Sequence, residues 1–247
     1  MQVDVPKIDA GSLPSLTRDQ MREVDRLMIE EYHIQLIQMM ENAGLQLARL
    51  TQGFLNSTGG GQRVLVLAGR GNNGGGGLAA ARRLAAWGAD VEVLFANALD
   101  AIEGVPLQQL DSLQQMDVPA QQFAETLPAH DLIIDALIGY GLQGAPRAPV
   151  SEMVDAANAS PAPIVSLDVP SGVDVDTGDV IGRAIRASAT LTLALPKAGL
   201  AQPNAQRFVG DLYLADIGVP VALYEKMGLG SPQPFIAGQL VQVTGLS

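Results

Sequence analysis

The sequence has no cysteine and only two histidines, His33 and His130. Without cysteine the chain can form no disulfide, no thiolate metal site and no cysteine nucleophile. Two histidines outside any metal-ligand spacing are too few for a histidine-based zinc cluster. We therefore expect both to be ordinary surface or helix-end residues.

Basic residues are also scarce, with 15 Lys and Arg against 26 Asp and Glu and a net charge of −11. This charge repels a phosphodiester backbone, and no basic stripe reverses it locally. The N-terminus lacks the basic and apolar regions of a signal peptide, and no apolar run approaches the roughly 18 residues of a membrane span. We expect a cytoplasmic protein that acts on a small molecule, with neither nucleic acid nor membrane as a partner.

Apolar residues are abundant, at 47% of the 247 positions, so the chain can bury a sizeable core. Its length suits one large domain, and no repeat or clear boundary divides residues 1–228. Residues 229–247 are rich in Gly, Pro and Gln. We expect this last segment to be a tail or the start of a linker.

Three segments have helical patterns. Thr17 and Gln20 have the spacing of a capping box, which predicts a helix from that point. Its apolar face would consist of Met21, Val24, Leu27 and Met28. A second pattern extends from Leu36 to Leu50, and a third covers the glutamine-rich stretch Leu107–Met116. The first two helices precede any strand, so we expect them to form a cap or an interface.

Six short apolar runs predict the strands of a buried sheet. They are Val64–Ala68, Val91–Ala96, Leu132–Leu137, Ile164–Val169, Leu191–Leu195 and Leu212–Ala215. Nearly continuous apolar runs are typical of parallel strands covered on both faces. Of the first four segments that separate consecutive runs, three are long enough to hold a helix. This alternation indicates an α/β doubly wound sheet. The last two runs lie closer together, so we expect hairpins that make the edge of the sheet mixed.

The first run leads into the glycine-rich segment Gly69–Gly77, and the helical pattern Leu78–Trp87 follows. Glycines at this point are expected to adopt positive φ and to let the backbone approach a ligand closely. Successive N–H groups and the positive end of the helix would bind an anion, while Asn72 and Asn73 add amide groups. The segment lacks the Lys of a Walker motif and the downstream acidic residue of a dinucleotide fingerprint.

Two later strand ends carry carboxylates. Asp135 lies inside an apolar run before a second glycine loop, and Asp168 precedes Pro170-Ser171-Gly172. A carboxylate among isoleucines is costly unless a cation or hydrogen-bond donors meet it, although Asp135 could simply cap its loop. Because ligands bind at the carboxyl ends of such strands, we expect Asn73, Asp135, Asp168 and Ser171 to converge. Amide, carboxylate and hydroxyl oxygens suit a hard cation, and Asp168 is free for acid–base work.

These motifs together resemble the NAD(P)H-hydrate epimerase family, the YjeF N-terminal domain. The resemblance rests on Gly71–Gly77, Asp135–Leu142 and Asp168–Gly172, with further agreement at Met40–Gly44, Thr190–Thr192, Pro196-Lys197 and Gly210–Leu212. It covers roughly residues 17–220.

The resemblance implies a Rossmann-like three-layer αβα sandwich and an isomerase. Its activity would be epimerisation of the R and S forms of hydrated NADH and NADPH, as part of nicotinamide nucleotide repair. The family further implies a homodimer, a potassium ion near the substrate, and a fused or separate ADP- or ATP-dependent dehydratase as a partner.

Site residues carry over by position. Potassium ligands would be Asn73, Asp135 and Ser171, and the proton-transfer residue would be Asp168. Substrate contacts would be Asn72, Asn73, Gly74, Gly75, Gly76, Gly139, Tyr140, Gly141, Leu142, Gln143, Gly144, Ala145 and Asp168. The family pattern has Asp where this chain has Gly76, so a non-catalytic nucleotide-binding or protein-interaction module of the same fold is the alternative.

Overall fold

The structure, a computed structural model, describes residues 4–58, 61–235 and 240–246. Its strands are β1 (Lys7–Asp9), β2 (Arg63–Ala68), β3 (Asp90–Phe95), β4 (Ala120–Gln122), β5 (Leu132–Ala136), β6 (Ile164–Leu167), β7 (Ala189–Leu193), β8 (Asp211–Ala215) and β9 (Val241–Thr244). Its helices are α1 (Arg18–Glu30), α2 (Leu36–Thr58), α3 (Asn72–Ala86), α4 (Gly104–Gln114), α5 (Val150–Ala159), α6 (Gln206–Val209) and α7 (Val221–Lys226). Short 3₁₀ turns are η1 (Ala10–Ser12), η2 (Leu99–Ala101) and η3 (Ala198–Ala201).

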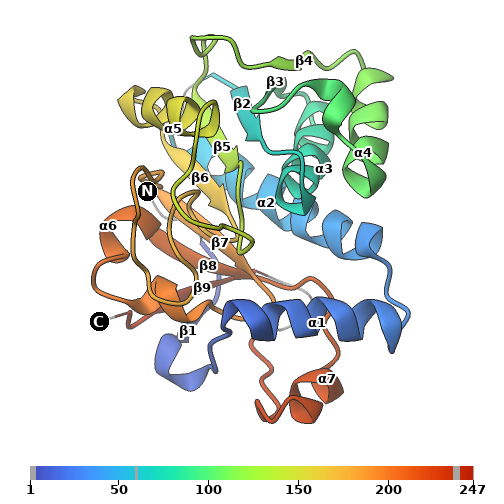
Figure 1. Cartoon of the computed structure of the whole chain (residues 1–247), viewed down its shortest axis with the longest axis vertical. Helices are drawn as coiled ribbons and strands as arrows, with labels where there is room; N and C mark the ends of the chain where they lie inside the picture. The colour runs from blue at the N-terminus through green and yellow to red at the C-terminus, as the bar shows by residue number, and fades with distance from the viewer. Residues whose placement is uncertain (1–3, 59–60, 236–239, 247) are drawn as a thin grey trace.

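The strands form one sheet in the order β1-β9-β8-β7-β6-β5-β2-β3-β4, with helices on both faces (Figure 1). On β2, Val64 and Val66 pack into the core beneath α2, α3 and α4, while Leu65 and Leu67 pack beneath α5. This alternation confirms the three-layer αβα sandwich, and all six predicted strands are present. No helix of the described residues is long and apolar enough to cross a membrane.

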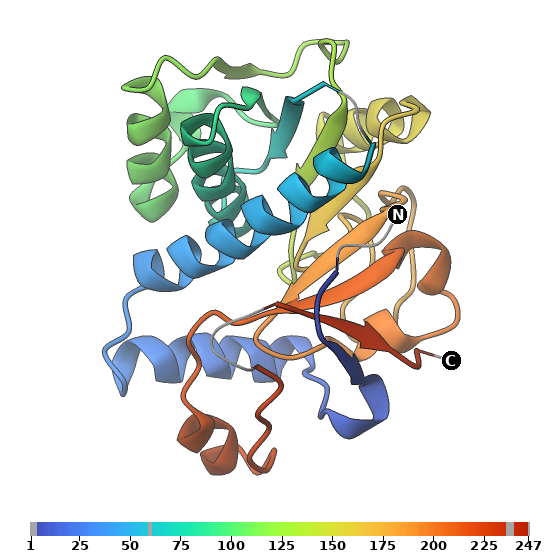
Figure 2. The same ribbon diagram turned by 180° about the vertical axis from the view of Figure 1, so that it is seen from behind.

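Within the described residues, every neighbouring pair of strands is parallel except β8 with β9. The predicted hairpin is therefore wrong for β7 and β8, which pair in parallel. The segment that joins them holds η3 and α6, and it is long enough to cross back to the start of the next strand. The sheet is mixed because β9, within 229–247, joins it between β1 and β8 (Figure 2). Residues 236–239 and 247 of that segment lie outside the described residues.

The glycine-rich segment differs from its prediction in one respect. The helix α3 begins at Asn72 rather than at Leu78, and none of the glycines between 69 and 77 has positive φ. Close packing of the backbone against neighbouring side chains explains why glycine occupies these positions. A Cβ at Gly77 would lie 2.5 Å from the Cβ of Ala136, and one at Gly75 would lie 2.6 Å from Cε of Met40.

The helix α1 begins as predicted, with the reciprocal capping box between Thr17 and Gln20. Its predicted apolar face, made of Met21, Val24, Leu27 and Met28, is buried. That face packs against α7 and the segment that follows β7. The helix thus caps one end of the sheet, beside the cavity described next (Figure 1).

Candidate active site at the carboxyl ends of the strands

A cavity of about 870 Å³ lies at the carboxyl ends of β2, β5, β6 and β7. Its wall includes α1, the start of α3 and the segment 137–150. This is the edge at which open α/β sheets bind ligands. The predicted contacts that line it are Asn72, Asn73, Gly76, Gly139, Tyr140, Gly141, Leu142, Gln143, Ala145 and Asp168. The wall does not include the other three predicted contacts, Gly74, Gly75 and Gly144.

Asp135 is fully buried on β5, in register with Ser166 of β6. Its Oδ2 accepts hydrogen bonds from Ser166 Oγ at 2.8 Å and from Ser171 N at 2.9 Å. Its Oδ1 accepts from Ser171 Oγ at 2.6 Å and from the main-chain N–H of Leu137 at 3.3 Å. Burial raises the pKa of the Asp135 carboxyl, because these donors offset only part of the desolvation.

Asn73 reaches the same region from the first turn of α3. In the orientation that satisfies its neighbours, its amide donates to the carbonyl of Leu167 and accepts from the N–H of Gly139, both at 3.3 Å. Ser171 Oγ accepts from the N–H of Ile138 at 2.9 Å. The structure thus brings Asn73, Asp135 and Ser171 together around the start of the second glycine loop, where parallel strand ends were expected to place them.

Asp168 follows β6 and lies in the wall of the cavity with only 3% of its surface exposed. Its φ of 67° is in the left-handed region, which a residue other than glycine seldom adopts. The carboxylate forms an ion pair with Lys197, with 2.6 Å between Oδ1 and Nζ. Oδ2 accepts a longer hydrogen bond of 3.3 Å from the main-chain N–H of Tyr140.

Lys197 is part of the family resemblance at Pro196-Lys197, but the sequence reasoning did not place it in the site. Its side chain is 1% exposed and also donates to Thr192 Oγ1 at 3.1 Å and to the carbonyls of Leu193 and Leu195 at 2.7 and 3.3 Å. A lone lysine directly after an apolar strand was a signal, because lysine is almost never fully buried unless it is paired. The sequence could not show which carboxylate pairs with it.

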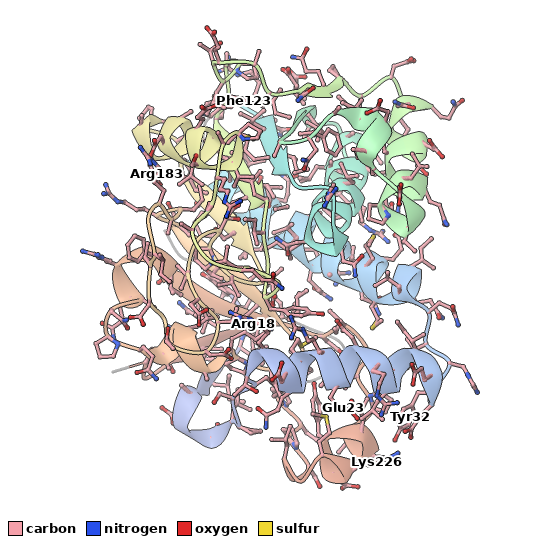
Figure 3. All side chains as sticks on the ribbon, viewed as in Figure 1. Arg18, Glu23, Tyr32, Phe123, Arg183 and Lys226 are labelled. Atoms are coloured by element: carbon pink, nitrogen blue, oxygen red, sulfur yellow. The ribbon has the colours of Figure 1, made fainter. Side chains whose placement is uncertain are left out.

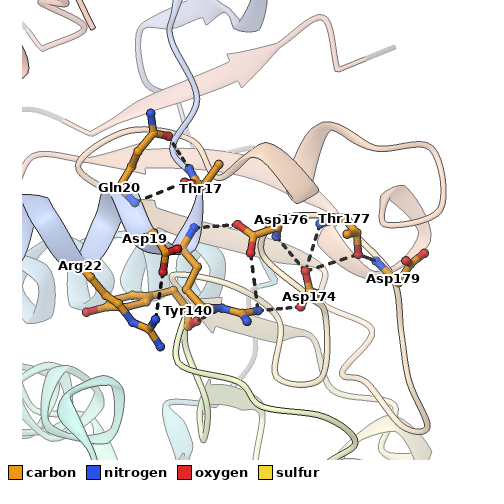
Figure 4. A network of polar contacts seen from close by, with 10 residues as sticks. Thr17, Asp19, Gln20, Arg22, Tyr140, Asp174, Asp176, Thr177 and Asp179 are labelled. Atoms are coloured by element: carbon orange, nitrogen blue, oxygen red, sulfur yellow. Dashed lines mark hydrogen bonds and ion pairs between the residues drawn. The ribbon is translucent and has the colours of Figure 1, made fainter. Parts of the chain in front are cut away.

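Tyr140 connects the second glycine loop to α1. Its hydroxyl donates to Oδ2 of Asp25 at 2.5 Å, and its carbonyl accepts from Nε of Arg18 at 3.1 Å. Arg18 also pairs with Asp174 at 2.6 Å, within the network around Tyr140 in Figure 4. Burial raises the pKa of Asp25, and the nearby charge of Asp168 adds to this effect. Sequence reasoning missed Asp25 too, although it follows Met21 by one helical turn on the buried side of α1.

Two exposed arginines, Arg70 and Arg147, also line the cavity. Neither belongs to an ion pair found among the described residues. Arg70 precedes Gly71, the N-cap of α3, and the first N–H groups of a helix suit an anion. The wall of the cavity therefore combines exposed cations with the buried carboxylate of Asp168 and the half-buried carboxylate of Asp25.

An open α/β sheet with a cavity, a buried carboxylate and a helix N-terminus at its strand ends is typical of one class of protein, enzymes that act on small molecules at this edge. Within that class, the family described as YjeF-related protein N-terminus matches residues 36–199. The chain belongs to this family.

Individual relatives agree with this membership. The chain is 44% identical to an NAD(P)H-hydrate epimerase of Dehalogenimonas lykanthroporepellens, over 96% of this chain and 95% of that protein. It is 38% identical to a bifunctional NAD(P)H-hydrate repair enzyme Nnr of Pyrobaculum aerophilum, over 84% of this chain but 42% of that longer protein. The crystal structure of the yeast protein ynu0, YNL200c, superposes with a TM-score of 0.80 at 26% identity, covering 93% of this chain and 100% of that one.

Proposed function

We propose that this protein is an isomerase that interconverts the R and S forms of hydrated NADH and NADPH, as part of nicotinamide nucleotide repair. The observation that carries the proposal is the Asp168 carboxylate, ion-paired on one oxygen and set in the wall of a cavity of about 870 Å³. Relatives that align over nearly the whole chain are named for this activity.

The chemistry needs one group that both takes and gives a proton. In the hydrate, the C6 hydroxyl stands on the carbon next to the ring nitrogen. The configuration at C6 inverts when the hydroxyl is lost and regained, or when the ring opens and recloses. Asp168 fits the proton-transfer role because Lys197 already occupies Oδ1, while Oδ2 has only the 3.3 Å contact with the N–H of Tyr140.

The charges around the cavity support a single orientation of the substrate. Arg70, Arg147 and the first N–H groups of α3 suit the phosphates. The uncharged hydrated ring would then lie toward Asp168, beside the apolar side chains of Met39 and Ile217. These apolar walls exclude water from the reacting carbon, which strengthens the electrostatic interactions of the carboxylate.

The residues near the second glycine loop fit a potassium ion. Asn73, Asp135 and Ser171 offer hard oxygen atoms, and no described basic side chain forms an ion pair with Asp135. A buried carboxylate with a raised pKa is the group that a bound cation would stabilise in its ionised form. When bound, the ion would supply fixed positive charge beside the loop. Asn73, Asp135 and Ser171 would hold it.

We further propose that the protein forms a homodimer and acts with an ADP- or ATP-dependent dehydratase that restores the cofactor. Fusion of the two activities in one chain is consistent with the bifunctional names of longer relatives, of which this chain spans 40–42%. Light scattering after gel filtration tests the dimer, with a mass near twice 25.8 kDa as the expected result.

A turnover assay tests the function. The pure R form of hydrated NADH is incubated with the protein, and the two epimers are separated by chromatography against a protein-free control. We expect equilibration far above the spontaneous rate, and a drop of roughly 10²-fold in the Asp168→Asn variant, which cannot accept the proton. Nucleotide binding without turnover would instead support the non-catalytic module.

A further inference from the structure

Lys197 is the most deeply buried cation that the structure describes. All the N–H groups of its ammonium are engaged by acceptors of the protein. Its ammonium group lies 2.6 Å from Oδ1 of Asp168 and 2.7 Å from the carbonyl of Leu193. Thr192 Oγ1 and the carbonyl of Leu195 complete the shell at 3.1 and 3.3 Å. An ammonium has three N–H groups, so these four acceptors leave none for a substrate.

The same lysine connects two strained points of the backbone. Asp168 and Ala194 have φ values of 67° and 66°, in the region that residues other than glycine seldom adopt. Lys197 binds the side chain of the first and the carbonyls on both sides of the second, those of Leu193 and Leu195. Strained residues persist only where the surroundings hold them, and such positions cluster at active sites.

The geometry points to Lys197 as the positioning residue of the epimerisation reaction. It fixes Oδ1 of Asp168, so that Oδ2 is the oxygen that exchanges a proton with the substrate. Lys197 acts through Asp168, because it does not belong to the wall of the cavity. This inference rests on the proposed function.

The decisive experiment is a double-mutant cycle between Lys197 and Asp168. Lys197→Met keeps the apolar stem and removes the ammonium. We expect its kcat to fall by roughly 10- to 100-fold while KM stays within about threefold, because Lys197 contacts the carboxylate and does not belong to the wall of the cavity. On the Asp168→Asn background the same substitution should cause almost no further loss of kcat, because no carboxylate remains for Lys197 to position.

Melting temperatures test the ion pair itself, whereas the kcat cycle separates the positioning role from a purely structural one. Lys197→Met alone leaves a buried carboxylate unpaired and should melt early, whereas Asp168→Asn/Lys197→Met should regain much of the lost stability. If Lys197→Met does not fold, Lys197→Arg replaces it. Arginine keeps the charge but moves it, so kcat should fall with KM preserved.

The matched control is Lys226→Met on α7. This exposed lysine is labelled in Figure 3 and pairs with Glu31. Neither residue belongs to the wall of the cavity, so the loss of Lys226 should leave kcat and KM unchanged. Normal kcat in the folded Lys197 variant, or an equal additional loss on the Asp168→Asn background, would overturn the inference while parent turnover stands. Absence of turnover in the parent would instead refute the proposed function.

Discussion

At the scale of single residues, Gly76 is where the chain departs from the pattern of its family. Gly76 lies in the wall of the cavity, and a Cβ there would meet Cδ2 of Leu167 at 2.7 Å. That atom is the end of a flexible side chain, so a larger residue can be accommodated by a rotation of Leu167. The position is close to the N-terminus of α3, which favours a carboxylate.

We therefore expect Gly76→Asp to raise kcat/KM. A charge-assisted hydrogen bond to a substrate hydroxyl contributes about 1.5–3 kcal/mol, or roughly 10- to 100-fold. Steady-state kinetics beside Gly76→Asn, which has the same shape without the charge, checks the prediction. Weaker nucleotide binding with no gain in rate would show that the new charge repels the phosphates instead.

Asp25 gives a pH-dependent prediction. Burial raises its pKa above the ordinary value of 3.8, so the folded protein binds this proton more tightly than the unfolded chain does. The free energy of unfolding therefore falls as pH rises from 3.8 through the raised pKa. Asp25→Asn should be more stable than the parent at pH 7 and nearly equal to it at pH 3. Urea unfolding at both values measures this, with the exposed Asp111→Asn on α4 as control. A difference that is the same at both pH values contradicts the argument.

At the scale of elements, α1 holds the second glycine loop in place. Arg18 binds the carbonyl of Tyr140 (Figure 4). Asp25 accepts from the hydroxyl of the same residue, so one helix contacts both ends of Tyr140. The family match begins at residue 36 and does not include α1. The loop that the site shares with the family is thus fixed by an element outside the matched region.

Removing the Tyr140 hydroxyl should loosen the loop. Tyr140→Phe leaves Asp25 without this donor, which costs about 1–3 kcal/mol of stability. We expect KM to rise several-fold with a smaller change in kcat, and faster amide hydrogen exchange in residues 139–145. Tyr32→Phe, at the other end of α1, removes a hydroxyl outside the cavity and should change neither. Unchanged KM and exchange in Tyr140→Phe would show that the contact with Arg18 alone holds the loop.

The sequence predicted the helices and strands better than it predicted which side chains contact each other. Strand ends could be located from apolar runs, so the meeting of Asn73, Asp135 and Ser171 was foreseeable. The start of α3 was misplaced because glycine weakens isolated helices, whereas here contacts with Ala136 and Met40 outweigh that propensity. The pairs Lys197–Asp168 and Tyr140–Asp25 join residues far apart in the chain, and no local pattern specifies such pairs.

At the scale of the whole molecule, a bound cation should affect global stability. If Asn73, Asp135 and Ser171 hold potassium, replacing sodium with potassium raises the melting temperature. A ligand at 100 times its Kd stabilises the folded state by about 2.7 kcal/mol. Asp135→Asn should remove most of the difference between the two salts. Asp131→Asn, four residues earlier and paired with Arg63 outside the site, should retain it. Identical melting and turnover in both salts would exclude the site.

The attachment of the N-terminal segment has a consequence for folding kinetics. Leu16, fully buried just before α1, pairs with Lys197: its N–H donates to the carbonyl of Pro196, and its carbonyl accepts from the N–H of Ala198. During synthesis, about 180 more residues must be made after Leu16 before this contact can form. Contacts of such high sequence separation slow folding, because loop closure is costly before any partner is gained. The active site should therefore be among the last regions to acquire native protection from hydrogen exchange during refolding.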